Sequence, residues 1–110
     1  MAQESLSAEI GRAWRMERDG DTKGAIAEFE RILKKDANSI DGLYGMGMAQ
    51  RRAGNNASAH QAFAKALELV NAAIEKRNAV RGAHETATLE DDRNNMLARM
   101  IKQRISEVKG

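Results

Sequence analysis

GMAQRRAGNNASAHQAFAKAL, residues 47–67, is the stretch that decides the fold, because residues 13–33 repeat its pattern as AWRMERDGDTKGAIAEFERIL. The two stretches lie 34 residues apart, and this one offset aligns the residues that they share. The aligned pairs are Ala13 with Gly47, Arg18 with Arg52, Gly20 with Gly54, Ala25 with Ala59, Phe29 with Phe63 and Leu33 with Leu67. A period of this length is typical of stacked repeats, so we expect two copies of one supersecondary unit.

Each copy is expected to be a helix, a glycine turn and a second helix. In the first copy the apolar residues after the turn are Ala25, Phe29, Ile32 and Leu33. Their i, i+4, i+7, i+8 spacing is that of one helical face. Gly20 stands just before this face, and a chain that reverses within a few residues often needs the left-handed backbone that glycine adopts at little cost.

The second copy carries a longer series of motif residues. They are Leu43, Met46, Gly47 and Gln50, then Ala59-x3-Phe63 and Ala66. On these residues the chain resembles the tetratricopeptide repeat (TPR) family, whose 34-residue hairpins carry W-x2-L-G-x2-Y, then A-x3-F, then Pro. The resemblance implies an all-α, right-handed helical-hairpin repeat, a TPR-like α-solenoid, with repeat one at residues 6–39 and repeat two at residues 40–73.

The first copy departs from the family pattern in its opening helix. It keeps Ala13, Met16, Gly20, Ala25 and Phe29, but Glu9 and Arg12 stand where the pattern has large apolar residues. The terminal Pro of the family is missing from both copies, where Ala37 and Asn71 take its place. After the first copy, Asn38-Ser39-Ile40-Asp41 is typical of a helix cap and predicts the start of the next helix.

The remaining residues predict a single fifth helix instead of a third hairpin. No Gly or Pro interrupts residues 56–81, so the fourth helix is expected to overrun its repeat and to end near Val80, before Gly82. Residues 74–88 then form the helix extension and a polar link over 83–87, with Thr88 as the next N-cap. The fifth helix, residues 89–108, is expected to cap the stack, since repeats bury their faces only against neighbours.

The apolar residues of this fifth helix cover a wide arc. They are Met96, Leu97, Met100, Ile101, Ile105 and Val108, and at 100° per residue they span about half of the circumference. A helix with one covered face needs a stripe of only ~100°, so part of this surface is available to a second partner. Met46, Met96 and Met100 are nevertheless expected on packing faces, as adaptable core residues.

Composition and motifs argue against several classes of function. The 110 residues include no cysteine, and 18 basic residues are interspersed with 16 acidic ones, a balance that favours neither nucleic acid nor a membrane as partner. The glycines of residues 42–47 lack the strand and the Lys-Ser/Thr of a phosphate loop, and are expected to serve close helix packing. His84-Glu85 lacks the second ligand of a zinc-protease motif, and His60 is expected to be a half-buried packing residue. We therefore expect no metal, no cofactor and no enzymatic activity.

One set of residues is a candidate binding surface. In the TPR family the first helix of each hairpin lines a concave groove, and its outward residues meet the ligand. The matching positions here are Ile10, Trp14 and Arg18 in the first copy and Tyr44, Met48 and Arg52 in the second. They predict a groove that is apolar at one end and basic at the other, unless the fifth helix fills it or Trp14 packs inside the fold.

The resemblance thus implies a cytoplasmic, non-catalytic adaptor that binds a peptide or helix of a partner protein in this groove. The subset of the family that grips carboxyl-terminal tails is excluded, because Ile10, Trp14 and Gly45 replace its Lys and Asn residues. The alternative function is a structural homo-oligomer, a dimer that assembles through the C-terminal helix across a two-fold axis.

Overall fold

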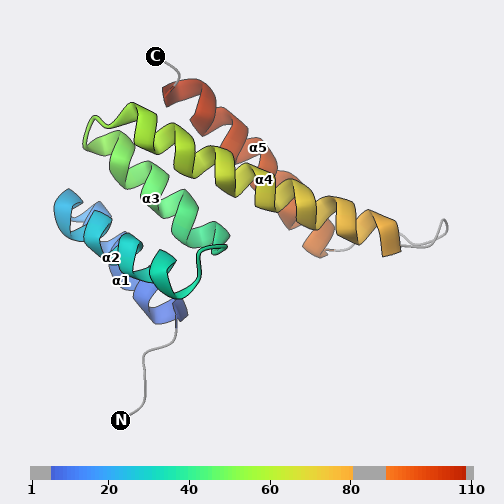
Figure 1. The fold of residues 1–110 in the computed structure, drawn as a ribbon, viewed down its shortest axis with the longest axis horizontal. Helices are drawn as coiled ribbons and strands as arrows, with labels where there is room; N and C mark the ends of the chain where they lie inside the picture. The colour runs from blue at the N-terminus through green and yellow to red at the C-terminus, as the bar shows by residue number, and fades with distance from the viewer. Residues whose placement is uncertain (1–5, 81–88, 109–110) are drawn as a thin grey trace, which may run out of the picture.

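The described part of the protein consists of consecutive α-helices, of which the first four are joined by short turns. The computed structural model describes residues 6–80 and 89–108, and these residues form five α-helices and no strand (Figure 1). The helices are α1 (Leu6–Arg18), α2 (Thr22–Lys35), α3 (Ile40–Arg52), α4 (Asn56–Val80) and α5 (Leu89–Val108). Each helix packs against the next along the chain, and α1 also contacts α3. The all-α class predicted from the sequence is confirmed.

The two glycine turns have the same backbone geometry. Gly20 has a φ of 89° and Gly54 a φ of 86°, both in the left-handed region. The N–H of the residue after each glycine donates to a carbonyl five residues earlier: Asp21 to Met16 at 2.9 Å, and Asn55 to Gln50 at 2.9 Å. These are the hydrogen bonds of a glycine-ended helix, and they recur at the 34-residue offset.

Helices α2 and α3 begin at capping side chains. The Asp21 carboxylate accepts a hydrogen bond from the Gly24 N–H at 3.0 Å, and the Ser39 hydroxyl accepts one from the Gly42 N–H at 3.0 Å. Each cap satisfies a backbone donor that the first helical turn leaves without an intrahelical partner. The cap predicted around Ser39 is confirmed.

Helix α3 packs closely against α2 on one side and α4 on the other. A Cβ on Gly45 would overlap the Phe29 ring of α2, and a Cβ on Gly47 would lie 2.5 Å from Cε1 of Phe63 in α4. Two residues turn a helix by about 200°, so these glycines face opposite ways. The close-packing role predicted for the glycines is confirmed, because each one admits a phenylalanine ring.

Two apolar clusters result, and α3 contributes to both. The first cluster joins α1, α2 and α3, with Ala62 of α4, around Phe29 and Ile32, which are fully buried. The second joins α3, α4 and α5 around Phe63, Val70 and Ile101, also fully buried.

Helix α1 meets its neighbours partly through ion pairs. Glu9 and Glu17 are buried, and their carboxylates pair with Lys35 of α2 and with Arg52 of α3. Arg12 lies 3.6 Å from the buried carboxylate of Glu28 in α2. The two charged residues that depart from the TPR pattern, Glu9 and Arg12, thus pair with charged residues of α2.

The fourth and fifth helices form a long arm. Helix α4 is described as far as Val80, and in Figure 1 its C-terminal part extends beyond the end of α3 with α5 beside it. Val70 of α4 and Ile101 and Val108 of α5 are buried in their contact. The predicted Gly82 stop, the link over 83–87 and the Thr88 cap lie outside the described residues.

Two predictions about single residues are wrong. Met96 and Met100 are not core residues: 55% and 37% of their surface is exposed, because α5 turns Ile101 and Val108 toward α4. His60 is exposed and not half-buried, because Ala59, Ala62 and Phe63 form the buried side of α4 there. Met46 is buried, as predicted.

Candidate functional site: the groove between α1 and α3

A row of aromatic rings runs across the contact between α1 and α3. Trp14 of α1 meets the buried ring of Phe29 edge-on, with centroids 5.7 Å apart and planes at 79°. It also contacts Tyr44 of α3, 6.0 Å away, and Tyr44 in turn lies 5.6 Å from Phe63. The only Trp and the only Tyr of the chain therefore link the two apolar clusters.

Four of the six predicted groove residues are half-buried and pack against the clusters. Ile10 and Trp14 lie against the first cluster, and Tyr44 and Met48 against the second. Of these four residues, Met48 also lines a hollow beside the contact between α1 and α3. The other two, Arg18 and Arg52, are exposed.

A hollow opens one helical turn beyond the contact of Trp14 with Tyr44. Its volume is about 320 Å³, and it is lined by Glu17, Met48, Arg51 and Arg52. Glu17 follows Trp14 by three residues and Met48 follows Tyr44 by four, so the hollow continues the aromatic row along both helices. The structure thus brings Met48 and Arg52 together at one hollow.

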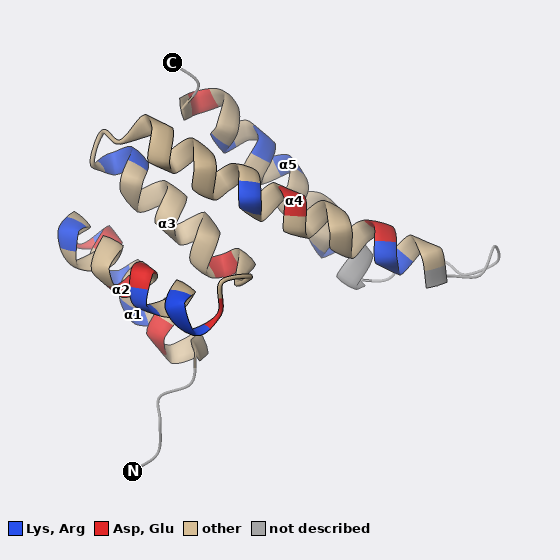
Figure 2. Cartoon of the chain, in the orientation of Figure 1, with Lys and Arg blue, Asp and Glu red and all other residues tan. Residues whose placement is uncertain are grey.

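The arginines of this hollow are held by carboxylates. The Arg52 Nε lies 2.6 Å from Oε1 of Glu17, and the Arg51 Nη1 lies 2.6 Å from Oε1 of Glu107 in α5. Helix α3 is uncharged over its middle and basic only at its C-terminal end, where both arginines lie (Figure 2). Arg18 is more accessible, since its side chain is 73% exposed and its contact with Asp19 is 3.7 Å long. The basic end of the groove is therefore largely neutralised, except at Arg18.

Glu17 holds a second acceptor atom at this site. Its side chain is 6% exposed, and only Oε1 takes part in the pair with Arg52. Oε2 is buried, and among the described residues it has no hydrogen-bond partner. A buried carboxylate oxygen without a partner is costly, which favours keeping Arg52 in place.

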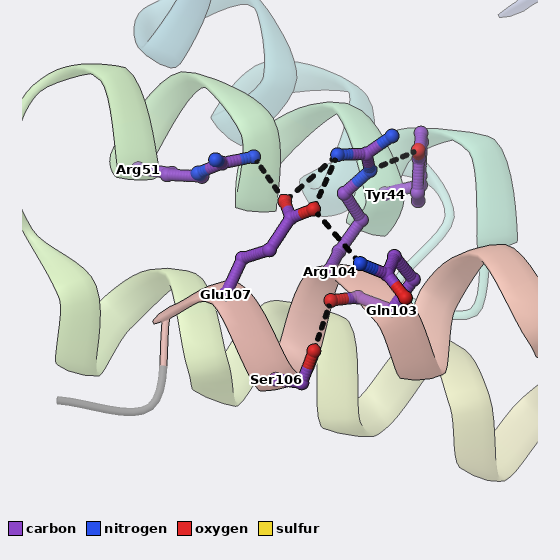
Figure 3. Close-up of polar contacts among 6 residues, drawn as sticks. All are labelled: Tyr44, Arg51, Gln103, Arg104, Ser106 and Glu107. Atoms are coloured by element: carbon purple, nitrogen blue, oxygen red, sulfur yellow. Dashed lines mark hydrogen bonds and ion pairs between the residues drawn. The ribbon is translucent and has the colours of Figure 1, made fainter.

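Helix α5 reaches the groove through a small polar network (Figure 3). The Arg104 Nε donates to the Tyr44 hydroxyl at 3.4 Å, and its Nη1 donates to Glu107 at 2.7 Å and 3.0 Å. Hydrogen bonds to Tyr44 and to Glu107 raise the pKa of Arg104 above its ordinary value. The hydrogen bond from Arg104 holds the pKa of Glu107 below its ordinary value, with smaller contributions from Gln103 and Arg51.

Sequence reasoning missed four residues of this site: Glu17, Arg51, Arg104 and Glu107. The i, i+3 spacing of Arg104 and Glu107 is the one signal that could have indicated a pair on one helix face. The pairs from Glu17 to Arg52 and from Arg51 to Glu107 join residues from different helices. No local spacing indicates them.

The hollow offers the apolar side chain of Met48, guanidinium donors and one carboxylate, and the half-buried ring of Trp14 lies one helical turn away. Within residues 6–80 and 89–108 there is no cluster of three or more His, Asp or Glu side chains that could hold a metal ion. The same helices include none that is long and apolar enough to cross a membrane.

Comparisons with known proteins leave the family open. No protein-family model matches the chain, and no curated protein matches it in sequence.

Proposed function

We propose that this chain is a TPR-like, non-catalytic interaction module that binds a peptide segment of a partner protein between α1 and α3. The observation that carries this proposal is the hollow beside the aromatic row. It places the apolar side chain of Met48 beside charged groups at the end of a half-buried row of rings. Large aromatic residues and arginines of this kind are the usual anchors of protein interfaces.

The TPR-like arrangement is supported by features that recur at the 34-residue offset. The two glycine turns share their hydrogen bonds, and Phe29 and Phe63, which align at this offset, are both fully buried. Helix α5 covers Val70 at the open side of the second hairpin, as the last element of a repeat stack must. These features favour two hairpins and a capping helix.

The size and charge of the hollow define the ligand that we propose. A volume of about 320 Å³ is at the lower end of the roughly 300–1,000 Å³ typical of ligand pockets. This favours a short extended segment over a docked helix. The segment would place an apolar side chain on Trp14 and Met48 and an acidic group near Arg18, whose guanidinium is the most accessible of the three.

Peptides selected from a displayed random library against the immobilised protein test this function. We expect selected peptides to combine one apolar and one acidic position and to change the fluorescence of Trp14, the only tryptophan. Met48→Glu should weaken their binding about tenfold or more, since it places a charge in the apolar part of the groove. Arg18→Ala should weaken binding about threefold, and this loss should shrink at high salt because exposed charges are screened.

Matched variants on α5 separate a groove effect from a general one. Met96→Glu and Arg99→Ala introduce the same chemistry at exposed positions away from the hollow, and both should leave peptide binding unchanged. If Met48→Glu and Met96→Glu bind the selected peptides equally well, the groove is not the binding site.

A further inference from the structure

Helix α5 presents a second surface that the proposed groove does not use. Met96 and Met100 lie one turn apart and are the large apolar side chains most exposed on the described helices. Arg93 and Arg99 flank them on either side, at about 40° and 80° from the middle of the pair on a helical projection. We name Met96, Met100, Arg93 and Arg99 the Met strip.

The strip is basic and its charges are available. Arg93 and Arg99 are exposed, and no ion pair engages either of them among the described residues. Asp92 is the only acidic residue between positions 92 and 103. The Met strip is therefore complementary to an apolar surface that has acidic residues beside it.

Such a surface lies along α4. A hollow of about 450 Å³, the arm groove, runs between α4 and α5, and its lining includes Leu67, Ala72 and Ile105 together with Glu68 and Glu75. Four of the seven lining residues are small or apolar, and the glutamates add two negative charges on the same side of α4. Within the described part of the chain neither Glu68 nor Glu75 has an ion-pair partner.

The arm groove and the Met strip face different ways. Ile105, which lines the groove, follows Met100 by five residues and Met96 by nine, so it lies about 140° and 180° around α5 from them. One copy therefore cannot place its own strip in its own groove. The two surfaces can meet only between separate molecules.

We propose that the Met strip of one copy docks in the arm groove of a second copy. The charges match in number and in their spacing along the helix axes: Glu68 and Glu75 are about 10 Å apart along α4, and Arg93 and Arg99 about 9 Å apart along α5. Two-fold pairing of α5 with itself would instead bring arginines of both copies together, which is unfavourable. Apolar burial of the two methionines supplies affinity, and the opposite charges set the register.

This contact is head-to-tail and does not depend on the groove between α1 and α3. Each docked copy still offers its own free strip or its own free groove, so assembly continues beyond two copies as concentration rises. The two-fold dimer expected from the sequence would stop at two. The head-to-tail contact and the two-fold dimer therefore differ in how the average mass rises with protein concentration.

Two complementary variants of the full chain test the contact. The strip variant carries Met96→Gln and Met100→Gln, which remove apolar surface without adding charge, and the groove variant carries Glu68→Lys and Glu75→Lys. All four positions are exposed. In analytical ultracentrifugation the natural chain should grow beyond a dimer at high micromolar concentration. Each variant alone should associate at least about tenfold more weakly than the natural chain.

Mixing the variants gives the decisive result. The strip of the groove variant and the groove of the strip variant are both intact, so an equimolar mixture should form a one-to-one dimer and no larger species. Glu30→Lys, an exposed charge reversal on α2, is the matched control and should associate as the natural chain does.

Three results would overturn the proposal. They are a natural chain that stays monomeric at high micromolar concentration, a natural chain that stops at a dimer, and a mixture of the variants that does not associate. Thermal melts followed by circular dichroism establish that both variants are folded.

Discussion

Helices α1 and α3 are the opening helices of the two hairpins, yet they contact their neighbours by different means. Helix α3 receives a phenylalanine ring on each side, Phe29 against Gly45 and Phe63 against Gly47. Helix α1 buries Glu9 and Glu17 and pairs them with Lys35 and Arg52. The central helix is thus held by close apolar packing and the terminal helix partly by charge.

The difference follows from the number of neighbours. Helix α3 lies between α2 and α4, so both of its sides are covered and both are apolar or small. Helix α1 packs against α2 and α3, and no described helix precedes it. Long charged side chains can pair there and still keep part of their surface in water, as Lys35 and Arg52 do.

The largest effect is expected at the ring contacts of α3. Gly45→Ala adds a Cβ that overlaps the Phe29 ring, so α2 and α3 must separate. The free energy of unfolding should fall by about 3 kcal/mol, less the small gain in helix propensity. Urea denaturation followed by circular dichroism measures this loss.

Gly11→Ala is the matched control for that substitution. On α1 the added Cβ would meet only the Arg15 guanidinium, 3.8 Å away, so no clash results. Here the higher helix propensity of alanine should raise the free energy of unfolding by about 0.5–1 kcal/mol. Equal effects of the two substitutions would show that the close approach at Gly45 is unimportant.

A smaller loss is expected when a charge pair of α1 is broken. Arg52→Ala leaves the buried carboxylate of Glu17 without its cation, which is destabilising although the arginine is 56% exposed. We expect the free energy of unfolding to fall by about 1 kcal/mol, since solvent screens part of the interaction.

A double-mutant cycle isolates that pair. In a protein that carries Glu17→Gln, Arg52→Ala should lower the free energy of unfolding much less, because an uncharged amide does not need the cation. Independent, additive effects of the two substitutions would mean that the pair contributes no coupling.

Replacing a buried glutamate by an apolar residue should stabilise the fold instead of destabilising it. Glu9 stands where the TPR pattern that the chain resembles has a large apolar side chain, and its Oε2 is buried with no hydrogen-bond partner among the described residues. Glu9→Met should therefore raise the free energy of unfolding by about 0.5–1 kcal/mol, while Lys35 remains in water. A destabilised Glu9→Met protein would show that charge is required at this end of the fold.

The smallest effect is expected from the pH dependence of the contact between α5 and α3. The pKa of Glu107 is lowered by its hydrogen bond from Arg104, so the folded protein favours the ionised carboxylate. The stabilisation is present above the ordinary glutamate pKa and is lost as the pH falls through the lowered value. Glu107→Gln should therefore lose less stability than the natural chain between about pH 7 and about pH 3.

Denaturation of both proteins across that range checks this sign. The two stability curves should converge at low pH and separate near neutrality. Curves that stay parallel would show that Glu107 does not contribute through its charge.

Local patterns in the sequence predicted the elements of the fold well. The cap at Ser39 and the glycines of the two turns follow from signals within a few residues of each other. The packing role of Gly45 and Gly47 also followed from their place in the repeat. These features depend on backbone geometry, which the neighbouring residues define.

Predictions about surfaces were less successful, because exposure depends on which helix lies opposite. Met96 and Met100 belong to the apolar residues of α5, but α4 covers only the side with Ile101 and Val108. Trp14 was placed in a groove, and it also packs edge-on against Phe29. A helical projection gives the faces of one helix but not the width of the neighbour that covers them.

The sequence by itself determined that the chain is helical, where its helices turn and that two hairpins share one period, because capping, glycine conformation and apolar spacing act over a few residues. Only the tertiary structure decided which charges are neutralised and which apolar residues stay exposed. The pairs between Glu17 and Arg52 and between Arg51 and Glu107 join residues 35 and 56 positions apart. Such contacts depend on the angle and spacing between helices, which the packing of rings against Gly45 and Gly47 establishes.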